Sequence, residues 1–322
     1  MRGRILSPGL QGSRRAALRG AFATAALASA APAWLSGCAG ARPGVADGYR
    51  PMLMRVTVPG SKGPAWLFGS IHAGADNLYP LPGPVTRAWQ ASTRLAVEID
   101  PVARAHELRG AYARMSVLPR RQRIEDLVGV EATLRIRRHF GFDDARWKHL
   151  SRLQPWALWL RLLQTSAARQ GLDPALGIDR HFVRRAGIRG LAITELEQAL
   201  EQLRAIAGGT PEAQAAELLA RFERLRRAPR AGHGLMAAWR AGDAAALEAL
   251  KDETFGPIPA ARQRMFGDRD QRIASRFVAL VRRIPDVFAV VGALHLVGPD
   301  GLPSLLSRAG ASIEPHDYGA PA

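Results

Sequence analysis

Short apolar segments, bounded by glycine, proline and polar residues, occur at both ends of the chain. Residues 51–58 alternate between apolar and polar side chains, which predicts a half-buried strand, and the apolar run 65–69 predicts its hairpin partner after a turn. Similar short runs at 94–100, 190–194, 285–292 and 312–315 predict further strands. Because neither end alone has enough strands for a sheet, we expect the two ends to pair with each other.

Between these strands the apolar residues recur at the three- and four-residue spacing of helices. The stretch 102–172 is largely helical by this criterion, and further helices are expected at 84–90, 178–187, 196–206, 211–227, 234–241, 243–250, 268–283 and 299–309. The sequence therefore predicts an α/β fold (mixed α+β) in a domain covering residues 51–318. Its central mixed sheet is built from the N- and C-terminal strands, with a large helical insertion over about residues 102–285.

The first 50 residues have a different composition, which is typical of an export signal followed by a tether. A basic front without acidic residues precedes an Ala-rich run at 21–35 that is shorter and less apolar than a membrane span. Residues 13–19 resemble a twin-arginine signal, and residues 35–38 (Leu-Ser-Gly-Cys) resemble a bacterial lipobox. We expect residues 1–37 to be a signal peptide and residues 38–50 a tether. The alternative is an ordinary secretory signal in which Cys38 is incidental.

If the lipobox is used, Cys38 carries a lipid and the protein is a lipoprotein of the bacterial cell envelope that faces the periplasm. Ala39 follows the cysteine, and without an Asp at that position we expect the outer membrane. Cys38 is the only cysteine, so the chain cannot form an internal disulfide. The folded domain must therefore be stabilised by its core.

The formal net charge is +17, which raises the question of a nucleic-acid partner. The basic residues are mostly arginines spread along predicted helices, and they are not interleaved with aromatic residues in a stripe. We therefore expect no nucleic-acid partner. Attraction to an anionic membrane surface or polymer accounts for such a charge, beside the membrane contact through the lipid anchor.

The candidate chemistry lies in a pattern that occurs twice. An apolar strand is followed by Gly-x-x-His at residues 69–72 and again at residues 292–295. Ligands of open α/β sheets bind at the carboxyl edge of the strands, so we expect His72 and His295 to meet at one site. Glu98 and Glu195 end two other predicted strands. Imidazole and carboxylate together suit zinc, manganese or iron, and an uncoordinated carboxylate could act as a general base on water.

Each of these residues also has a purely structural interpretation. A histidine after a strand can be hydrogen-bonded without binding anything, and Glu98 could pair with an arginine while Asp100 faces the site. Glu195 could be a carboxylate favoured by the N-terminus of a helix. No compact metal motif such as H-E-x-x-H is present in the sequence.

Four segments in this order resemble the TraB/GumN family, which is related to the Tiki metalloproteases. They are residues 69–72 (Gly-Ser-Ile-His), 97–100 (Val-Glu-Ile-Asp), 193–195 (Ile-Thr-Glu) and 292–295 (Gly-Ala-Leu-His), the last followed by Gly-Pro-Asp-Gly-Leu at 298–302. Residues 177–179 and 239–243 resemble family positions as well. The resemblance covers about residues 52–314. It implies a metal-dependent hydrolase, acting on a peptide or protein substrate, with His72, Glu98, Glu195 and His295 around a divalent metal such as Mn, Zn or Co.

One position departs from the family pattern. The family tends to have Arg-Asn at the start of the long helix before the last buried strand, where this chain has Arg269-Asp270. Arg269 could stabilise a developing oxyanion, or it could lie on a solvated helix face with Arg272 and Arg276.

Together these features predict a lipid-anchored periplasmic metal-dependent hydrolase, with Glu98, Glu195 and Arg269 as the catalytic residues. The alternative is a non-catalytic envelope protein that holds a peptide, cofactor or polymer in the same cleft.

Overall fold

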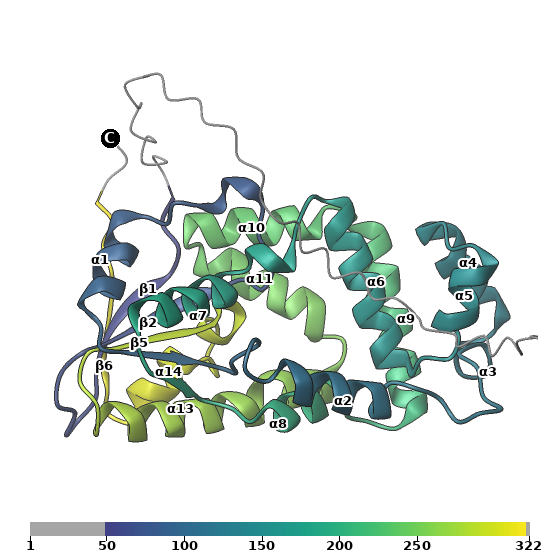
Figure 1. Ribbon diagram of the computed structural model, residues 1–322. Helices are drawn as coiled ribbons and strands as arrows, with labels where there is room; N and C mark the ends of the chain where they lie inside the picture. The colour runs from purple at the N-terminus through teal and green to yellow at the C-terminus, as the bar shows by residue number, and fades with distance from the viewer. Residues whose placement is uncertain (1–48, 320–322) are drawn as a thin grey trace, which may run out of the picture. The chain divides into compact units, whose positions relative to one another are not determined.

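A computed structural model describes residues 49–319, and over them it shows a mixed α/β architecture around one six-stranded sheet (Figure 1). The expected signal peptide, the lipobox with Cys38 and most of the expected tether lie outside the described residues. Within residues 49–319 we find no helix whose length and apolar character would let it cross a membrane.

The sheet interleaves the two ends of the chain, as predicted. Its strands, in the spatial order β4-β3-β5-β2-β1-β6, are β1 (Leu53–Thr57), β2 (Ala65–Ser70), β3 (Arg94–Val97), β4 (Ile193–Glu195), β5 (Val287–Gly292) and β6 (Ser312–Pro315). The four strands β4, β3, β5 and β2 run parallel, whereas β1 is antiparallel to both β2 and β6. The C-terminal strand β5 therefore lies between two N-terminal strands.

Burial explains why the strand sequences differ. All six residues of β5 are buried, because helices cover both faces of the parallel part of the sheet. β1 buries alternate residues toward its end, and β6 at the edge is largely exposed. The register sets Phe68 of β2 opposite Val290 of β5, and the two Gly-x-x-His segments leave the sheet side by side.

Helices pack on both faces of the sheet (Figure 1). On one face, Phe182 of α7 (Ile178–Arg189) packs against Phe288 of β5 and, edge to face, against Trp89 of α1 (Gly83–Ala91). On the other face lie α13 (Asp268–Val281) and α14 (Leu302–Arg308). These helices and the sheet share the largest apolar core of the described residues.

The insertion is mostly helical and has a core of its own, with Leu158, Leu162, Leu218 and Phe222 fully or almost fully buried. The predicted stretch 102–172 is divided into α2 (Ala105–Met115), α3 (Glu125–Val128), α4 (Val130–Phe140), α5 (Asp144–Leu150) and α6 (Pro155–Arg169). The later helices are α8 (Ala199–Ala207), α9 (Pro211–Arg227), α10 (Ala231–Ala241), α11 (Ala244–Phe255) and α12 (Pro259–Arg262), and a π-helix, η3 (Gln263–Gly267), joins α12 to α13. Short 3-10 turns are η1 (Asp76–Leu78), η2 (Pro174–Leu176) and η4 (Ala293–Leu296).

Several predicted boundaries differ from the structure. The helices expected from residues 234 and 299 begin at Ala231 and Leu302, and the helix expected to end at residue 250 ends at Phe255. Helix α7 continues past Gly187 and ends at Arg189, where Gly190 adopts the left-handed conformation (φ +65°) that glycine tolerates. The helix expected from residue 196 begins only at Ala199, because Gln198 and Glu201 form a capping box there. Residues 196–197 instead continue along β3, with the Glu197 N–H donating to the Glu98 carbonyl at 2.8 Å.

Trp239 ties helix α10 to the end of β2. Its indole N–H donates to the Gly69 carbonyl at 2.7 Å, and the side chain is fully buried. This contact fixes the backbone three residues before His72. Trp89 is a natural comparison, because it is also buried in the same core but its indole N–H has no hydrogen-bond partner.

We expect Trp239→Phe to lower the free energy of unfolding by about 1–3 kcal/mol more than Trp89→Phe, because only the first leaves a buried carbonyl unpaired. Both substitutions remove the same volume. Urea unfolding of the two variants measures the difference, and equal losses would show that the Gly69 hydrogen bond contributes nothing to stability.

Candidate functional site

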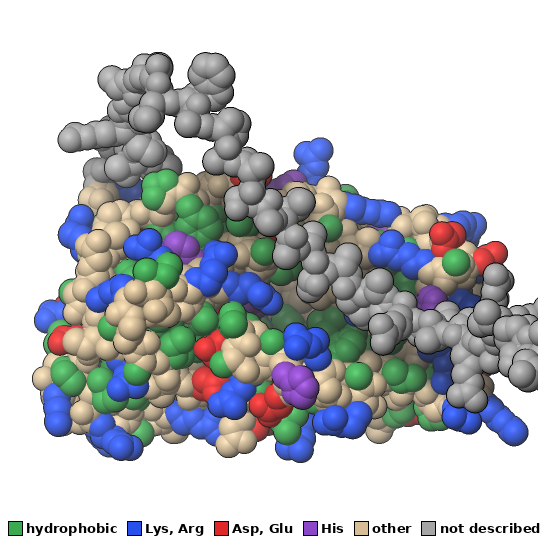
Figure 2. All heavy atoms as spheres, viewed as in Figure 1, with side chains coloured by type: hydrophobic (Ala, Val, Ile, Leu, Met, Phe, Trp, Pro, Cys, Tyr) green, Lys and Arg blue, Asp and Glu red, His purple; other side chains and the backbone are tan. Residues whose placement is uncertain are grey.

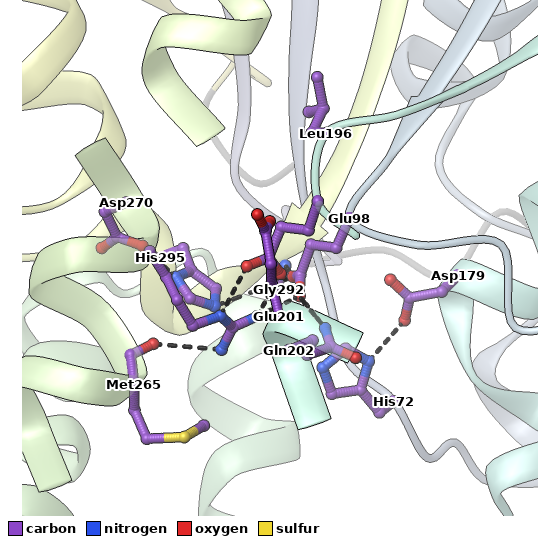
Figure 3. Close-up of polar contacts among 12 residues, drawn as sticks. His72, Glu98, Asp179, Leu196, Glu201, Gln202, Met265, Asp270, Gly292 and His295 are labelled. Carbon is purple, nitrogen blue, oxygen red and sulfur yellow. Dashed lines mark hydrogen bonds and ion pairs between the residues drawn. The ribbon is translucent and has the colours of Figure 1, made fainter. Parts of the chain in front are cut away.

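Three of the predicted residues meet at the carboxyl edge of the sheet. His72 follows β2, Glu98 follows β3, and His295 lies in η4 directly after β5 (Figure 3). They surround Gly292, where an added Cβ atom would lie 3.3 Å from Glu98 Oε1, 3.4 Å from His295 Cδ2 and 3.6 Å from His72 Nε2. We call these three side chains around Gly292 the Gly292 cluster. The absence of a side chain at Gly292 leaves the space into which they converge.

His72 is held by an aspartate from the first turn of α7. Its Nδ1 lies 2.9 Å from Asp179 Oδ2, and Asp179 Oδ1 accepts a hydrogen bond from the Ser70 hydroxyl at 2.8 Å. The close approach explains Gly177, since a Cβ atom there would lie 2.5 Å from the His72 carbonyl oxygen. The Asp179 carboxylate raises the pKa of His72 to about 9. The His72 side chain is 70% exposed, so the cluster opens to solvent on this side.

His295 is held in the same way from the opposite face of the sheet. Its Nδ1 is hydrogen-bonded to Asp270 Oδ1, in the first turn of α13, and both side chains are buried. Asp270 Oδ2 is buried without a hydrogen-bond partner, and burial raises the pKa of Asp270. The buried Lys251 adds positive charge near Asp270 and donates to the Val297 carbonyl at 3.1 Å. The aspartate at position 270 thus orients His295 through Nδ1.

The Glu98 carboxylate is buried and fully engaged. Its Oε1 accepts the Gly292 N–H at 2.7 Å, and its Oε2 accepts from Arg269 Nη2 at 2.9 Å and from Gln202 Nε2 at 3.1 Å. Burial raises the pKa of Glu98, but the charges of His295, Arg269 and His72 outweigh it and lower the pKa to about 2. So weak a base is a poor proton acceptor near neutral pH, although it remains a charged ligand.

Arg269 does not lie on a solvated helix face, and that alternative is wrong because the residue is only 2% exposed. Its Nε and Nη2 donate to the two oxygens of Glu197 at 2.9 and 2.6 Å, and Nη2 also reaches Glu98. Nη1 donates to the Met265 carbonyl at 3.1 Å. The guanidinium thus holds the carboxylates of Glu98 and Glu197 in position by direct hydrogen bonds.

Glu195 does not join the cluster, contrary to the prediction. Its carboxylate accepts the Asp100 N–H at 2.8 Å and forms an ion pair with Arg104 at 2.6 Å. Asp100 is also engaged elsewhere, because its Oδ1 accepts the N–H groups of Val102 and Ala103. The alternative in which Asp100 replaces Glu98 at the site is therefore not supported.

The sequence analysis gave no site role to Asp179, the partner of His72, or to Glu197, whose side chain is fully buried against Arg269. Glu197 was hidden by the wrong start of the following helix, since residue 197 was placed inside it. The capping box of Gln198 and Glu201 is visible in the sequence and could have moved the helix start past Glu197.

The site has more Asp and Glu side chains than Lys and Arg side chains. Four carboxylates (Glu98, Asp179, Glu197 and Asp270) stand against two cations, Arg269 and Lys251. Carboxylates that are removed from water need compensating positive charge. Protons on both imidazoles or one divalent cation would supply it.

The donor set fits a divalent cation. Both imidazoles give Nδ1 to a carboxylate and leave Nε2 for the cluster, which is the usual support of metal-binding histidines. His295 Nε2 and Glu98 Oε1 are 3.9 Å apart, too far for a hydrogen bond but within the separation of about 3–4 Å expected for two ligands of one metal. Among residues 49–319, however, we find no group of three or more His, Cys, Asp or Glu side chains close enough together to hold a metal ion as they stand.

A comparison with protein families finds a match over most of the chain. The family model described as "TraB/PrgY/gumN family" matches residues 52–315. No curated protein and no solved structure matches the chain.

We expect Arg269→Gln to lower the free energy of unfolding by about 3–5 kcal/mol, because it leaves two buried carboxylates without their cation. Arg276→Gln in the same helix is the matched control. Arg276 pairs with Glu201 at a partly exposed position, so its loss should cost about 0–1 kcal/mol. Urea unfolding measures both.

The double variant Arg269→Gln/Glu197→Gln should recover part of the loss, since it also removes one of the unpaired charges. A loss from Arg269→Gln no larger than that from Arg276→Gln would contradict the role assigned to the buried guanidinium.

Proposed function

The chain belongs to the TraB/PrgY/gumN family, and on that premise we propose that it is a metal-dependent hydrolase that cleaves peptide bonds. One observation carries the proposal: two aspartate-backed histidines from opposite ends of the chain lie with Glu98 around Gly292, and His295 Nε2 is 3.9 Å from Glu98 Oε1. We further propose that the enzyme is a lipoprotein, anchored through Cys38 on the periplasmic side of the cell envelope.

His72, His295 and Glu98 would hold the cation, which when bound would polarise a carbonyl and lower the pKa of a water. Asp179 and Asp270 accept the Nδ1–H groups, so an imidazole that gives up its Nε2 proton to a bound cation would have its lone pair on Nε2. Arg269 and Gln202 hold Oε2 of Glu98, so its Oε1 faces the cluster. We assign Glu98 to binding and not to proton transfer, because Arg269 and Gln202 fix its Oε2 while its Oε1 lies at the point where the imidazoles converge.

Glu195, which is paired with Arg104, has no part in this proposal. Arg269 acts through Glu98 and Glu197 as a positioning residue. The exposed His72 marks the side from which a substrate would enter, since His295 and Glu98 are buried.

A second candidate is a non-catalytic envelope protein that holds a peptide, cofactor or polymer in the same place. It is favoured by the saturation of Glu98, which already accepts three N–H donors from Gly292, Arg269 and Gln202. A carboxylate that already accepts three hydrogen bonds binds a metal ion more weakly than a free carboxylate does.

Metal content separates the two candidates. We expect the purified protein, after dialysis against Mn, Zn or Co, to retain about one metal ion per chain by mass spectrometry. His72→Ala and His295→Ala should lose it. A wild-type protein that is folded but metal-free would support the binding protein.

Gly292→Ala is the sharper variant, because it keeps every ligand and adds a methyl group where the three side chains converge. We expect it to weaken metal binding by at least about tenfold while the fold is retained. Gly187→Ala is the matched control, since a Cβ atom there would meet nothing within 4 Å. Equal metal affinity in the two variants would contradict the cluster as the metal site.

Peptide cleavage can then be tested directly. Wild-type protein should cleave members of a mixed peptide library in the presence of the retained metal, and a chelator should stop the reaction. Cleavage that survives in His295→Ala would come from a contaminant. A metal-loaded wild type that cleaves no peptide would limit the proposal to metal binding.

The anchor is tested separately. We expect the wild-type protein to sediment with membranes and to incorporate labelled fatty acid, and Cys38→Ser to lose both properties because no other cysteine is present. Unchanged membrane association and labelling in Cys38→Ser would contradict a lipoprotein.

A further inference from the structure

A hollow on the helical insertion is lined by positive charge and contains no acidic residue. Its volume is about 500 Å³, and it lies between α5 and α6 with the lining residues Arg146, Arg161, Gln164, Thr165, Ala168 and Arg169. The hollow is shallow and largely open to solvent, so charge would have to supply most of the binding energy of a ligand there.

The three arginines are held in place by uncharged partners. The guanidinium of Arg146 lies 4.6 Å from the ring centroid of Phe142, and that of Arg161 lies 5.8 Å from the ring of Tyr112. Arg169 lies over Phe140 at 5.4 Å and donates to the carbonyls of His139 and Phe140 at 3.1 and 2.7 Å. Such contacts orient guanidinium groups but do not neutralise them.

No carboxylate within residues 49–319 pairs with these three side chains. The nearest acidic residues along the chain are engaged elsewhere, since Asp143 accepts the Arg146 backbone N–H at the start of α5 and Asp144 pairs with Arg137. Elsewhere in the insertion, Arg135 and Arg226 pair with Glu223. Other arginines of the insertion are therefore paired with carboxylates, whereas the three that line the hollow are not.

Lys and Arg side chains are spread over the face shown in Figure 2, with few acidic ones between them. A diffuse charge of this kind attracts any polyanion weakly. The hollow differs because Arg146, Arg161 and Arg169 line one space, where the other polar side chains, Gln164 and Thr165, are hydrogen-bonded to Arg161.

We propose that this hollow binds a phosphate-bearing ligand. The guanidinium group of arginine can donate two parallel hydrogen bonds to the oxygens of one phosphate. A phosphate group also carries a charge of about −1.5 to −2 at pH 7, so it neutralises several arginines better than a single carboxylate would. The phosphate can belong to a lipid headgroup or to a free phosphate compound. The inference does not depend on the metal chemistry of the Gly292 cluster.

The test uses the full chain with Cys38→Ser, so that a lipid anchor cannot bind vesicles. Pyrophosphate is the soluble probe, and vesicles of phosphatidylcholine with and without phosphatidylglycerol are the membrane probe. Arg146→Gln/Arg161→Gln removes two exposed arginines of the hollow, and Arg169 is kept because it also holds the end of α4. Arg282→Gln/Arg283→Gln removes the same charge from exposed positions at the end of α13.

We expect the hollow variant to weaken pyrophosphate binding at least about tenfold, and the control variant by less than about twofold, in isothermal titration at constant salt. A parallel loss of binding to phosphatidylglycerol vesicles identifies the ligand as a lipid headgroup. Unchanged vesicle binding identifies a free phosphate compound.

If both variants lost the same amount of pyrophosphate affinity, the effect would come from net charge alone and the proposal would be overturned. So would a wild-type protein that binds neither pyrophosphate up to about 10 mM nor anionic vesicles. Circular dichroism of both variants checks that the fold is retained.

Discussion

The structure depends on the insertion of β5 between β2 and β3. This pairing joins segments separated by about two hundred residues, and each backbone hydrogen bond in it closes the loop formed by the whole insertion. Because β2 and β5 are parallel and in register, their Gly-x-x-His segments leave the sheet at the same edge. The juxtaposition of His72 and His295 is thus a consequence of strand pairing, and Asp179 and Asp270 of the insertion then orient their imidazoles.

The second layer of the site comes from helix N-termini on opposite faces of the sheet. Asp179 lies in the first turn of α7 and Asp270 in the first turn of α13, where the helix dipole favours a negative charge. Each carboxylate reaches the Nδ1 atom of one histidine. The two histidines are nevertheless unequal, because His72 is exposed and His295 is buried beside Phe266. One side of the site is therefore open, and the other is closed and anchored in the core.

The buried charges of the site are costly. Glu98, Glu197, Arg269 and Asp270 are each less than 5% exposed, and buried ion pairs commonly stabilise a fold no better than apolar side chains of similar size. Asp270 Oδ2 is even left without a hydrogen bond. A chain under selection for stability alone has no use for such an arrangement. Its cost is understandable if the excess of carboxylates serves to attract and hold a cation.

The sequence by itself determined the strands, the parallel edge at which chemistry gathers, and the two histidines, because a buried strand followed by glycine is a local pattern. Only the tertiary structure decided which carboxylates accompany them. Glu195 and Glu197 are two residues apart, and the start of α8 and the position of Arg104 determine that Glu197 is buried while Glu195 is bound elsewhere. Likewise, Arg269 lies in the same helix as the partly exposed Arg272 and Arg276, and it is buried against Glu98 and Glu197, which come from distant segments. Side-chain partners that lie far apart in the chain leave no local pattern, which is why they had to be read from the fold.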